Sequence, residues 1–281
     1  FFLSLNNSHL LNVEMDKVEN YSSKAEEILH PLKPYVPAIA RFLIVVTFLE
    51  DSFRIVFQWE DQIWYLSKYR GMPWGITHLF LALNVITMLA GSVLVIRRLY
   101  TEYAVLGLFL VVVAQSIGYG LIFDLNFFLR NLSVIGGLFM VLSEAFAKKK
   151  SPFPGLPQLS ENDRKKYLQL AGRILLIFLF IGFIFSGELS LQRVIVSIIG
   201  LIACIMVVVG FKAKWSATFL VLFLSVFNVL MHNWWSMHHN HPQRDFLKYD
   251  FFQTLSIMGG LMLLVNMGPG GISIDEKKKV F

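Results

Sequence analysis

The stretch Ile195–Gly210, IVSIIGLIACIMVVVG, contains no charged residue. A helix needs roughly 20 mostly apolar residues to cross the ~30 Å hydrocarbon core of a bilayer. Within that core, the backbone N–H and C=O groups of a span have to be paired inside the protein. With the residues that flank it, the stretch therefore predicts a membrane-spanning helix over about 192–211.

The composition extends this prediction to the whole chain. Of the 281 residues, 56% are hydrophobic and 16% are charged, and 26 are Phe, whereas a soluble domain carries about 25% charged residues. We therefore expect an all-α polytopic membrane protein. The net charge of +6 does not indicate nucleic-acid binding, because basic residues mark the cytoplasmic loops of membrane proteins. The single cysteine, Cys204, excludes a disulfide within the chain.

Seven further segments approach the length of a span. We expect about eight transmembrane helices, at about 38–58, 75–96, 102–123, 126–147, 167–186, 192–211, 216–234 and 248–267.

The loops between these segments alternate in character. One set is basic and includes Arg97, Arg98, Lys148–Lys150, Arg164–Lys166, Lys212, Lys214 and Lys277–Lys279. The opposite loops hold Trp59, Trp64, Trp74, Trp234 and Trp235. The basic set is expected to face the cytosol, and aromatic residues favour membrane interfaces. With eight spans, both termini are then cytosolic.

An internal repeat divides the spans into two parallel halves. Leu132–Leu138 (LSVIGGL) recurs as Leu255–Leu261 (LSIMGGL), and Ala40–Ile44 (ARFLI) resembles Gly172–Leu176 (GRILL). The basic turns in LVIRRLYTEYAVLG and VVGFKAKWSATFL also correspond.

The predicted domains follow from these features. They are a cytosolic segment 1–34, four-helix halves at 35–147 and 167–267, a basic cytosolic linker at 148–166 and a cytosolic tail at 268–281. Residues 1–14 precede Met15, a plausible initiator, and we interpret them as an incomplete or incorrect start.

Charged residues inside predicted spans are the strongest functional candidates, because they are costly in hydrocarbon. Glu50 and Arg54 are four residues apart and share a helix face, with Asp51 beside them. One interpretation is that these charges neutralise one another and fix helix packing. The other is a lumenal pocket that also involves Asp124, Arg130 and Trp59, with either Arg130 or a cationic ligand as the partner of Asp124.

No catalytic, cofactor or metal motif accompanies these residues. We find no phosphate loop, no Ser/His/Asp arrangement and no dinucleotide fingerprint, so an enzyme is not expected. His232, His238, His239 and His241 lie in one loop, but their spacing does not indicate a zinc site, and we interpret the loop as solvated.

The C-terminus, DEKKKVF, places Lys278 and Lys279 at the fourth and third positions from the end, with Lys277 before them. On a cytosolic tail this pattern is a dilysine retrieval signal read by the COPI coat, and terminal retrieval signals of this kind are addresses read by receptors. Val280 and Phe281 are candidates for an export signal.

Four stretches are similar to one known family. FLEDSFRIVFQW (Phe48–Trp59), FDLNFFLRNLSVIGGL (Phe123–Leu138), RDFLKYDFFQTLSIMGGL (Arg244–Leu261) and NMGPGGISIDEKKK (Asn266–Lys279) resemble surfeit locus protein 4 and the Erv-type cargo receptors of the endoplasmic reticulum. Each half also resembles the bacterial DoxX-type membrane proteins.

The resemblance implies a receptor that cycles between the endoplasmic reticulum, the intermediate compartment and the Golgi. It would bind soluble secretory cargo in the lumen through hydrophobic motifs near the cargo N-terminus, leave in COPII vesicles and return through COPI. A secondary transporter and a membrane-organising scaffold are the alternatives. A homo-oligomer is compatible with each of these roles, the receptor included.

Overall fold

The computed structural model of the chain describes residues 34–148, 159–178, 191–238, 241 and 243–277. All regular elements in these ranges are helices. In chain order they are α2 (Val36–Phe57), α3 (Trp59–Lys68), α4 (Trp74–Arg97), α5 (Thr101–Gly118), η2 (Leu121–Phe123), α6 (Leu125–Lys148), α7 (Leu159–Leu176), α9 (Leu191–Val209), α10 (Ala213–Met231), η3 (Trp234–Ser236), α11 (Gln243–Met267) and α12 (Ile274–Lys277).

Five of the described helical stretches are long and apolar enough to cross a membrane. They are Trp74–Arg97, Thr101–Gly118, Phe127–Ala147, Ala213–Ser236 and Gln243–Met267. This confirms an all-α polytopic membrane protein. Helix α2 has the length of a span but carries Arg41, Glu50, Asp51 and Arg54. The count of eight spans stays a prediction, since residues 179–190, in the predicted fifth span and the loop after it, lie outside the described residues.

The outward faces of the helices are apolar. Along α4, Ile76, Leu79, Leu83 and Ile86 recur at helical spacing and are all exposed. A row of exposed large apolar side chains on a long helix marks a surface that contacts lipid.

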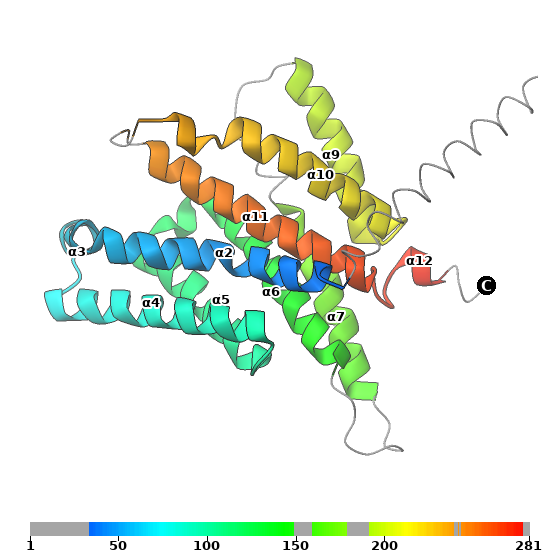
Figure 1. The fold of residues 1–281 in the computed structure, drawn as a ribbon, viewed down its shortest axis with the longest axis horizontal. Helices are drawn as coiled ribbons and strands as arrows, with labels where there is room; N and C mark the ends of the chain where they lie inside the picture. Colours follow the sequence, from blue (N-terminus) through cyan, green and yellow to red (C-terminus); the bar gives the residue numbers. More distant parts are fainter. Residues whose placement is uncertain (1–33, 149–158, 179–190, 239–240, 242, 278–281) are drawn as a thin grey trace, which may run out of the picture.

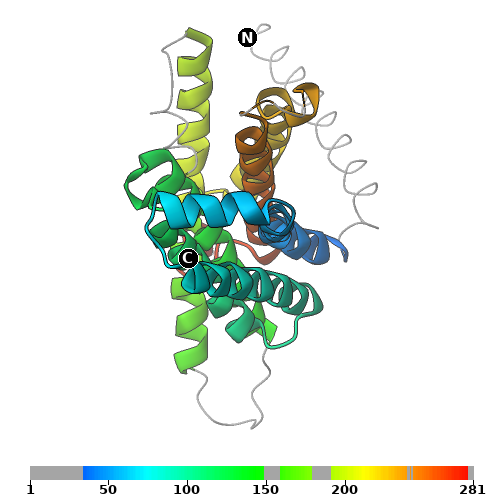
Figure 2. The ribbon, with the colours of Figure 1, turned by 90° about the vertical axis from the view of Figure 1, so that its left-hand side faces the viewer.

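The bundle is organised around pairs of packed helices (Figure 1). Helix α2 lies between α4 and α11, and α6 packs against α7, α5 and α11. Helix α10 packs between α9 and α11. The short helix α3, which the sequence did not predict, lies across one end of the bundle (Figure 2).

The closest approach of α6 and α7 depends on a glycine. A Cβ added at Gly136 would lie 2.9 Å from the carbonyl oxygen of Gly172 and 2.8 Å from the backbone nitrogen of Leu176. Lipid tails are as apolar as the side chains, so helix association in membranes relies on close packing of small residues. The backbones of α6 and α7 meet here with no room for a side chain.

Helices α11 and α2 pack in the same way. A Cβ at Gly259 would lie 2.6 Å from the carbonyl oxygen of Ala40 and 2.8 Å from the backbone nitrogen of Ile44. In the aligned repeat, Gly259 corresponds to Gly136, and Ala40 and Ile44 correspond to Gly172 and Leu176. The repeated sequences therefore form the same helix contact twice.

A Cβ added at Gly260 would also lie 3.0 Å from the Cα of Gly137, its counterpart in α6. These are the contacts that two repeats related by a two-fold axis would make.

The two basic turns share a backbone geometry. In the α4–α5 turn, φ is +60° at Arg98 and +46° at Tyr100; in the α9–α10 turn it is +73° at Gly210 and +45° at Lys212. Left-handed φ values are uncommon outside glycine, so their recurrence at aligned positions supports the repeat.

Three boundaries differ from those expected. Helix α7 begins at Leu159, inside the segment predicted as linker, and α11 begins at Gln243, five residues before the predicted span. Helix α5 ends at Gly118, and η2 follows where the third span was expected to continue to 123. Polar residues in the first turns of α7 and α11 explain the first two differences, because a hydrophobicity pattern does not detect helix that extends beyond the hydrocarbon core.

Candidate ligand-binding cavity

A cavity of about 510 Å³ opens at the end of the bundle opposite the basic loops. It lies where α2, α5, η2, α6 and α11 come together. Its lining is Asp51, Arg54, Gln115, Tyr119, Leu121, Asp124, Phe127, Arg130, Asp245, Phe246, Tyr249 and Asp250. Four of the six predicted pocket residues, Asp51, Arg54, Asp124 and Arg130, therefore line one cavity.

Asp51 is held from two sides. Its Oδ1 accepts a hydrogen bond from Nη2 of Arg54, one turn on in α2, and its Oδ2 accepts one from Nε2 of Gln115 at 2.6 Å. The Arg54 guanidinium also lies over the ring of Tyr249, 5.8 Å from its centroid. These contacts link α2 to α5 and α11.

The predicted Glu50–Arg54 pair is not formed. Because Arg54 turns to Asp51, Glu50 pairs instead with Lys248 of α11, with 3.2 Å between Oε1 and Nζ. The Glu50 carboxylate is buried and does not line the cavity. Residues three apart on a helix can pair as well as residues four apart, so spacing alone does not distinguish Asp51 from Glu50 as the partner of Arg54.

Arg130 pairs with Asp250, with 3.0 Å between Nη1 and Oδ1. Of the two partners expected for Asp124, Arg130 is therefore not the one it meets. Asp124 accepts a hydrogen bond from the backbone N–H of Phe127 at 3.1 Å and so caps the start of α6. Its side chain is exposed at the rim.

Helix α11 supplies the lining residues that sequence reasoning missed. Asp245, Phe246, Tyr249 and Asp250 follow an i, i+1, i+4, i+5 spacing, which places them on one face of a helix. The spacing was readable in RDFLKYDFFQT, but the predicted span began only at Lys248. At the rim, Asp245 accepts a hydrogen bond from Nε2 of Gln58 at 2.9 Å, and Phe246 is 74% exposed.

Trp59 does not line the cavity. Its ring lies 6.1 Å from that of His78, centroid to centroid, at the start of α3. In the histidine loop, His232 is buried and its Nδ1 lies 2.7 Å from Oδ1 of Asn228, whereas His239 lies outside the described residues. Within those residues, no group of three or more His, Cys, Asp or Glu side chains is placed to hold a metal ion.

The C-terminal segment is fixed at the opposite end of the bundle. Asp275 accepts hydrogen bonds from the backbone N–H groups of Lys212 at 2.8 Å and Ala213 at 3.0 Å. Arg173, which is fully buried, donates to the carbonyl oxygen of Ile272 at 2.5 Å. Helix α12 ends at Lys277, while Lys278, Lys279, Val280 and Phe281 lie outside the described residues.

Comparison with known proteins gives consistent matches over almost the whole chain. The SURF4 family model matches residues 14–281. A surfeit locus protein 4 homolog of Schizosaccharomyces pombe is 47% identical over 93% of this chain and 87% of its own length. The ER-derived vesicles protein ERV29 of Saccharomyces cerevisiae is 43% identical over 94% of this chain and 85% of its own length.

A surfeit locus protein 4 homolog of Drosophila melanogaster is 41% identical over 96% of this chain and 99% of its own. No solved structure matches the chain. The family match and these identities, which extend from the charged α2 to the C-terminal segment, show that the chain belongs to the SURF4 family.

Proposed function

We propose that the chain is a cargo receptor of ER-derived vesicles, which binds soluble secretory proteins in the lumen through the cavity at the end of α2 and α11. Membership of a family that includes an ER-derived vesicles protein supports the vesicle role. The cavity, which combines surplus negative charge with exposed aromatic surface, is the observation that carries the proposal.

The charge of the loops supports a lumenal opening for this cavity. The basic turns at Arg97–Arg98 and Lys212–Lys214 lie at the end of the bundle away from the cavity, and basic loops face the cytosol. The cavity then opens to the lumen, where soluble secretory proteins reach it. Trp64 and Trp74, both exposed, lie at the same end of the bundle as the cavity.

The charge balance favours a cationic ligand. Four aspartates and two arginines line the cavity, and each arginine is paired with one aspartate inside it. Within the part of the chain that the structure describes, Asp124 and Asp245 lie at the rim and accept hydrogen bonds from neutral groups only. Two rim carboxylates beside Phe127 and Phe246 fit a protein N-terminus whose amine carries a positive charge and whose first side chains are apolar.

The repeat provides an internal comparison for the charges. When Arg41 is aligned with Arg173, the positions that match Glu50, Asp51 and Arg54 are Gly182, Phe183 and Ser186. Arg130 likewise matches Gln253. The second half carries no charge at these positions, so the four-helix plan does not itself require them. This favours the ligand-binding interpretation over the purely structural one.

In this proposal, the C-terminal tail carries the signal for return from later compartments. Asp275 and Arg173 hold the segment before it against α10 and α7 at the cytosolic end, so Lys278 and Lys279 follow directly after an anchored helix. A retrieval signal for COPI has to be presented free in the cytosol at the end of the chain. COPII is the coat proposed for the forward step, with Val280 and Phe281 as its signal.

A binding measurement tests the cavity. The full chain in detergent is titrated with a fluorescent peptide whose first residues are apolar, with the N-terminus free or acetylated. We expect Asp124→Asn/Asp245→Asn to weaken binding of the peptide with a free N-terminus about tenfold, since each partly exposed charge pair contributes up to ~1 kcal/mol. Acetylation of the peptide should lower its affinity for the parent chain by a similar factor and should hardly change its affinity for the variant.

Asp61→Asn is the matched control, because Asp61 is an exposed acid of α3 outside the lining. Equal affinity of free and acetylated peptide for the parent chain would exclude amine recognition. An unchanged affinity of the double variant would place the peptide elsewhere.

A further inference from the structure

Each half contains a buried arginine close to the N-terminus of the helix that follows its basic turn, but the two halves differ in what occupies this place. In the second half, Arg173 and the N-terminus of α10 are both occupied by the C-terminal segment, through the Ile272 carbonyl and the Asp275 carboxylate. A carboxylate at a helix N-terminus is a favourable arrangement, because the free N–H groups there attract anions.

In the first half, the equivalent place is a cavity of about 430 Å³. Its lining includes Arg41, the counterpart of Arg173, and Tyr100 and Thr101, the counterparts of Lys212 and Ala213. Across the ranges that the structure describes, no acceptor is placed on the backbone N–H groups of Tyr100 or Thr101. The start of α5 therefore presents to this cavity the donors that Asp275 satisfies in α10.

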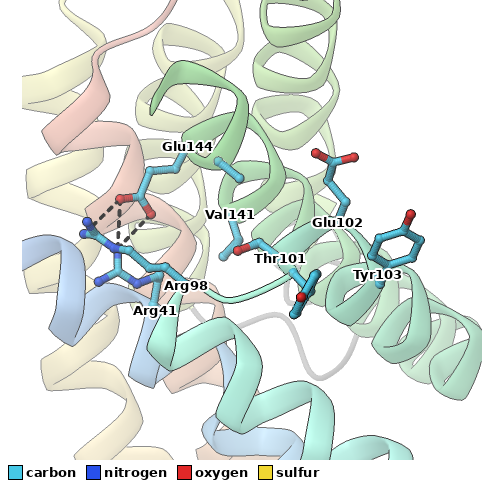
Figure 3. A pocket seen from close by; sticks show the side chains of 9 residues that line it. Arg41, Arg98, Thr101, Glu102, Tyr103, Val141 and Glu144 are labelled. Atoms are coloured by element: carbon cyan, nitrogen blue, oxygen red, sulfur yellow. Dashed lines mark hydrogen bonds and ion pairs between the residues drawn. The ribbon is translucent and has the colours of Figure 1, made fainter. Parts of the chain in front are cut away.

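Two arginines converge on the cavity (Figure 3). Arg41 is only 4% exposed and donates from Nη1 to both oxygens of Glu144, at 2.8 and 3.0 Å. Nη2 of Arg98 lies 3.3 Å from the same carboxylate. Two guanidinium groups thus share one carboxylate, and Nε of Arg41 is buried with no hydrogen-bond partner among the described residues. Buried donors of this kind normally have an acceptor.

The segment that follows α6 does not supply the missing acid. In the second half, the carboxylate comes from the residues just after α11, whereas residues 148–158 after α6 contain no Asp or Glu. The one further acid in the cavity lining is Glu102, which follows Thr101 and would disfavour an anion.

The cavity lies at the membrane interface on the cytosolic side. Tyr100 and Tyr103, which line it, are 74% and 75% exposed, and tyrosine concentrates at the level of lipid headgroups. Arg98 has a 43% exposed side chain that reaches from this level to Glu144. Arginine binds phosphate through two or more parallel N–H groups.

We propose that this cavity binds a phosphate group, as the monoester headgroup of an anionic lipid in the cytosolic leaflet or as free phosphate. Arg98 and Arg41 would contact its oxygens together with the N–H groups of Tyr100 and Thr101. The site is separate from the lumenal cavity and does not depend on the cargo role.

Lipid binding to the full chain in detergent tests the proposal. Native mass spectrometry measures retention of phosphatidic acid against phosphatidylcholine, for the parent chain, Arg98→Gln and the control Arg97→Gln. Arg97 is the adjacent exposed arginine outside the cavity lining, so both variants lose the same charge. We expect Arg98→Gln to weaken phosphatidic acid binding about tenfold, the loss of one charge-assisted hydrogen bond, and Arg97→Gln to change it less than twofold.

The source of the phosphate is distinguished by competition. Displacement of phosphatidic acid by millimolar inorganic phosphate shows that the free ion suffices, and retention of the lipid shows that the lipid is needed. Either result supports the site if Arg98→Gln weakens phosphatidic acid binding more than Arg97→Gln does. Equal loss in the two variants, or no preference of the parent chain for phosphatidic acid, overturns the proposal. Displacement by an acidic peptide but not by phosphate also overturns it.

Discussion

Replacing Gly136 by Ala tests the helix contact on which the two halves are built. The added Cβ would lie 2.8 Å from the backbone nitrogen of Leu176 and 2.9 Å from the carbonyl oxygen of Gly172, about half an ångström short of ordinary contact. Both are backbone atoms, so α6 and α7 have to separate. Overpacking of this kind costs about 1–3 kcal/mol, against about 1 kcal/mol gained from the better helix propensity of Ala.

The neighbouring Gly137→Ala is a matched control. Its Cβ would meet the nearest atoms at 3.6 and 3.7 Å, in ordinary contact, so the gain in helix propensity is kept. We expect Gly136→Ala to lower the stability by up to about 2 kcal/mol, which is the overpacking cost less the gain in helix propensity, and Gly137→Ala to leave it equal or raise it by up to about 1 kcal/mol.

The assay is thermal denaturation in detergent, followed by the folded fraction on size exclusion. Gly259→Ala should behave like Gly136→Ala, because it meets the backbone of α2 equally closely. Equal midpoints for the Gly136 and Gly137 variants would refute the close-packing argument, and opposite effects of the Gly136 and Gly259 variants would refute the equivalence of the two contacts.

Two further predictions concern the C-terminal segment. Asp275→Asn removes the charge from two hydrogen bonds at the start of α10 and should lower the free energy of unfolding by about 1 kcal/mol. The control, Asp163→Asn, affects only an exposed pair with Lys166 and should change this free energy by less than about 0.5 kcal/mol. Equal effects of the two variants would contradict the capping role of Asp275. Lys278→Ser/Lys279→Ser should move the protein from early secretory membranes to later compartments by fractionation, and an unchanged distribution would count against retrieval by the tail.

Much of the fold could be predicted from the sequence, because the signals are local. Long apolar stretches such as the one that forms α4 indicate spans, and the recurring LSxxGGL sequence indicates the repeated helix contact. Helix α3 was missed because its residues, Trp59–Lys68, are amphipathic and too few to cross a membrane. A search for long apolar segments does not detect such a helix.

The cavity was only partly predictable, because the spacing of residues along one helix does not determine which residues of another helix they contact. Asp51, Arg54 and Arg130 were found from the cost of charge in a membrane, and Asp124 from its place at the turn between two predicted spans. The partners were not: Glu50 pairs with Lys248 and Arg130 with Asp250, and both partners come from α11, more than a hundred residues away. Only the packing of α11 between α2, α6 and α10 brings these groups together.

Site-specific photocrosslinking from position 246 tests whether soluble cargo binds at the cavity. Phe246 is exposed at the rim of the cavity formed by α2, α5, α6 and α11, and Trp215, 73% exposed at the opposite end of the bundle, is the control position. A photoreactive residue is placed at either position in cells that secrete a soluble cargo. We expect a cargo adduct from position 246, reduced by Asp124→Asn/Asp245→Asn, and no adduct from position 215. Cargo adducts of equal yield from both positions, or no adduct from position 246 in folded protein, would show that cargo does not bind at this cavity.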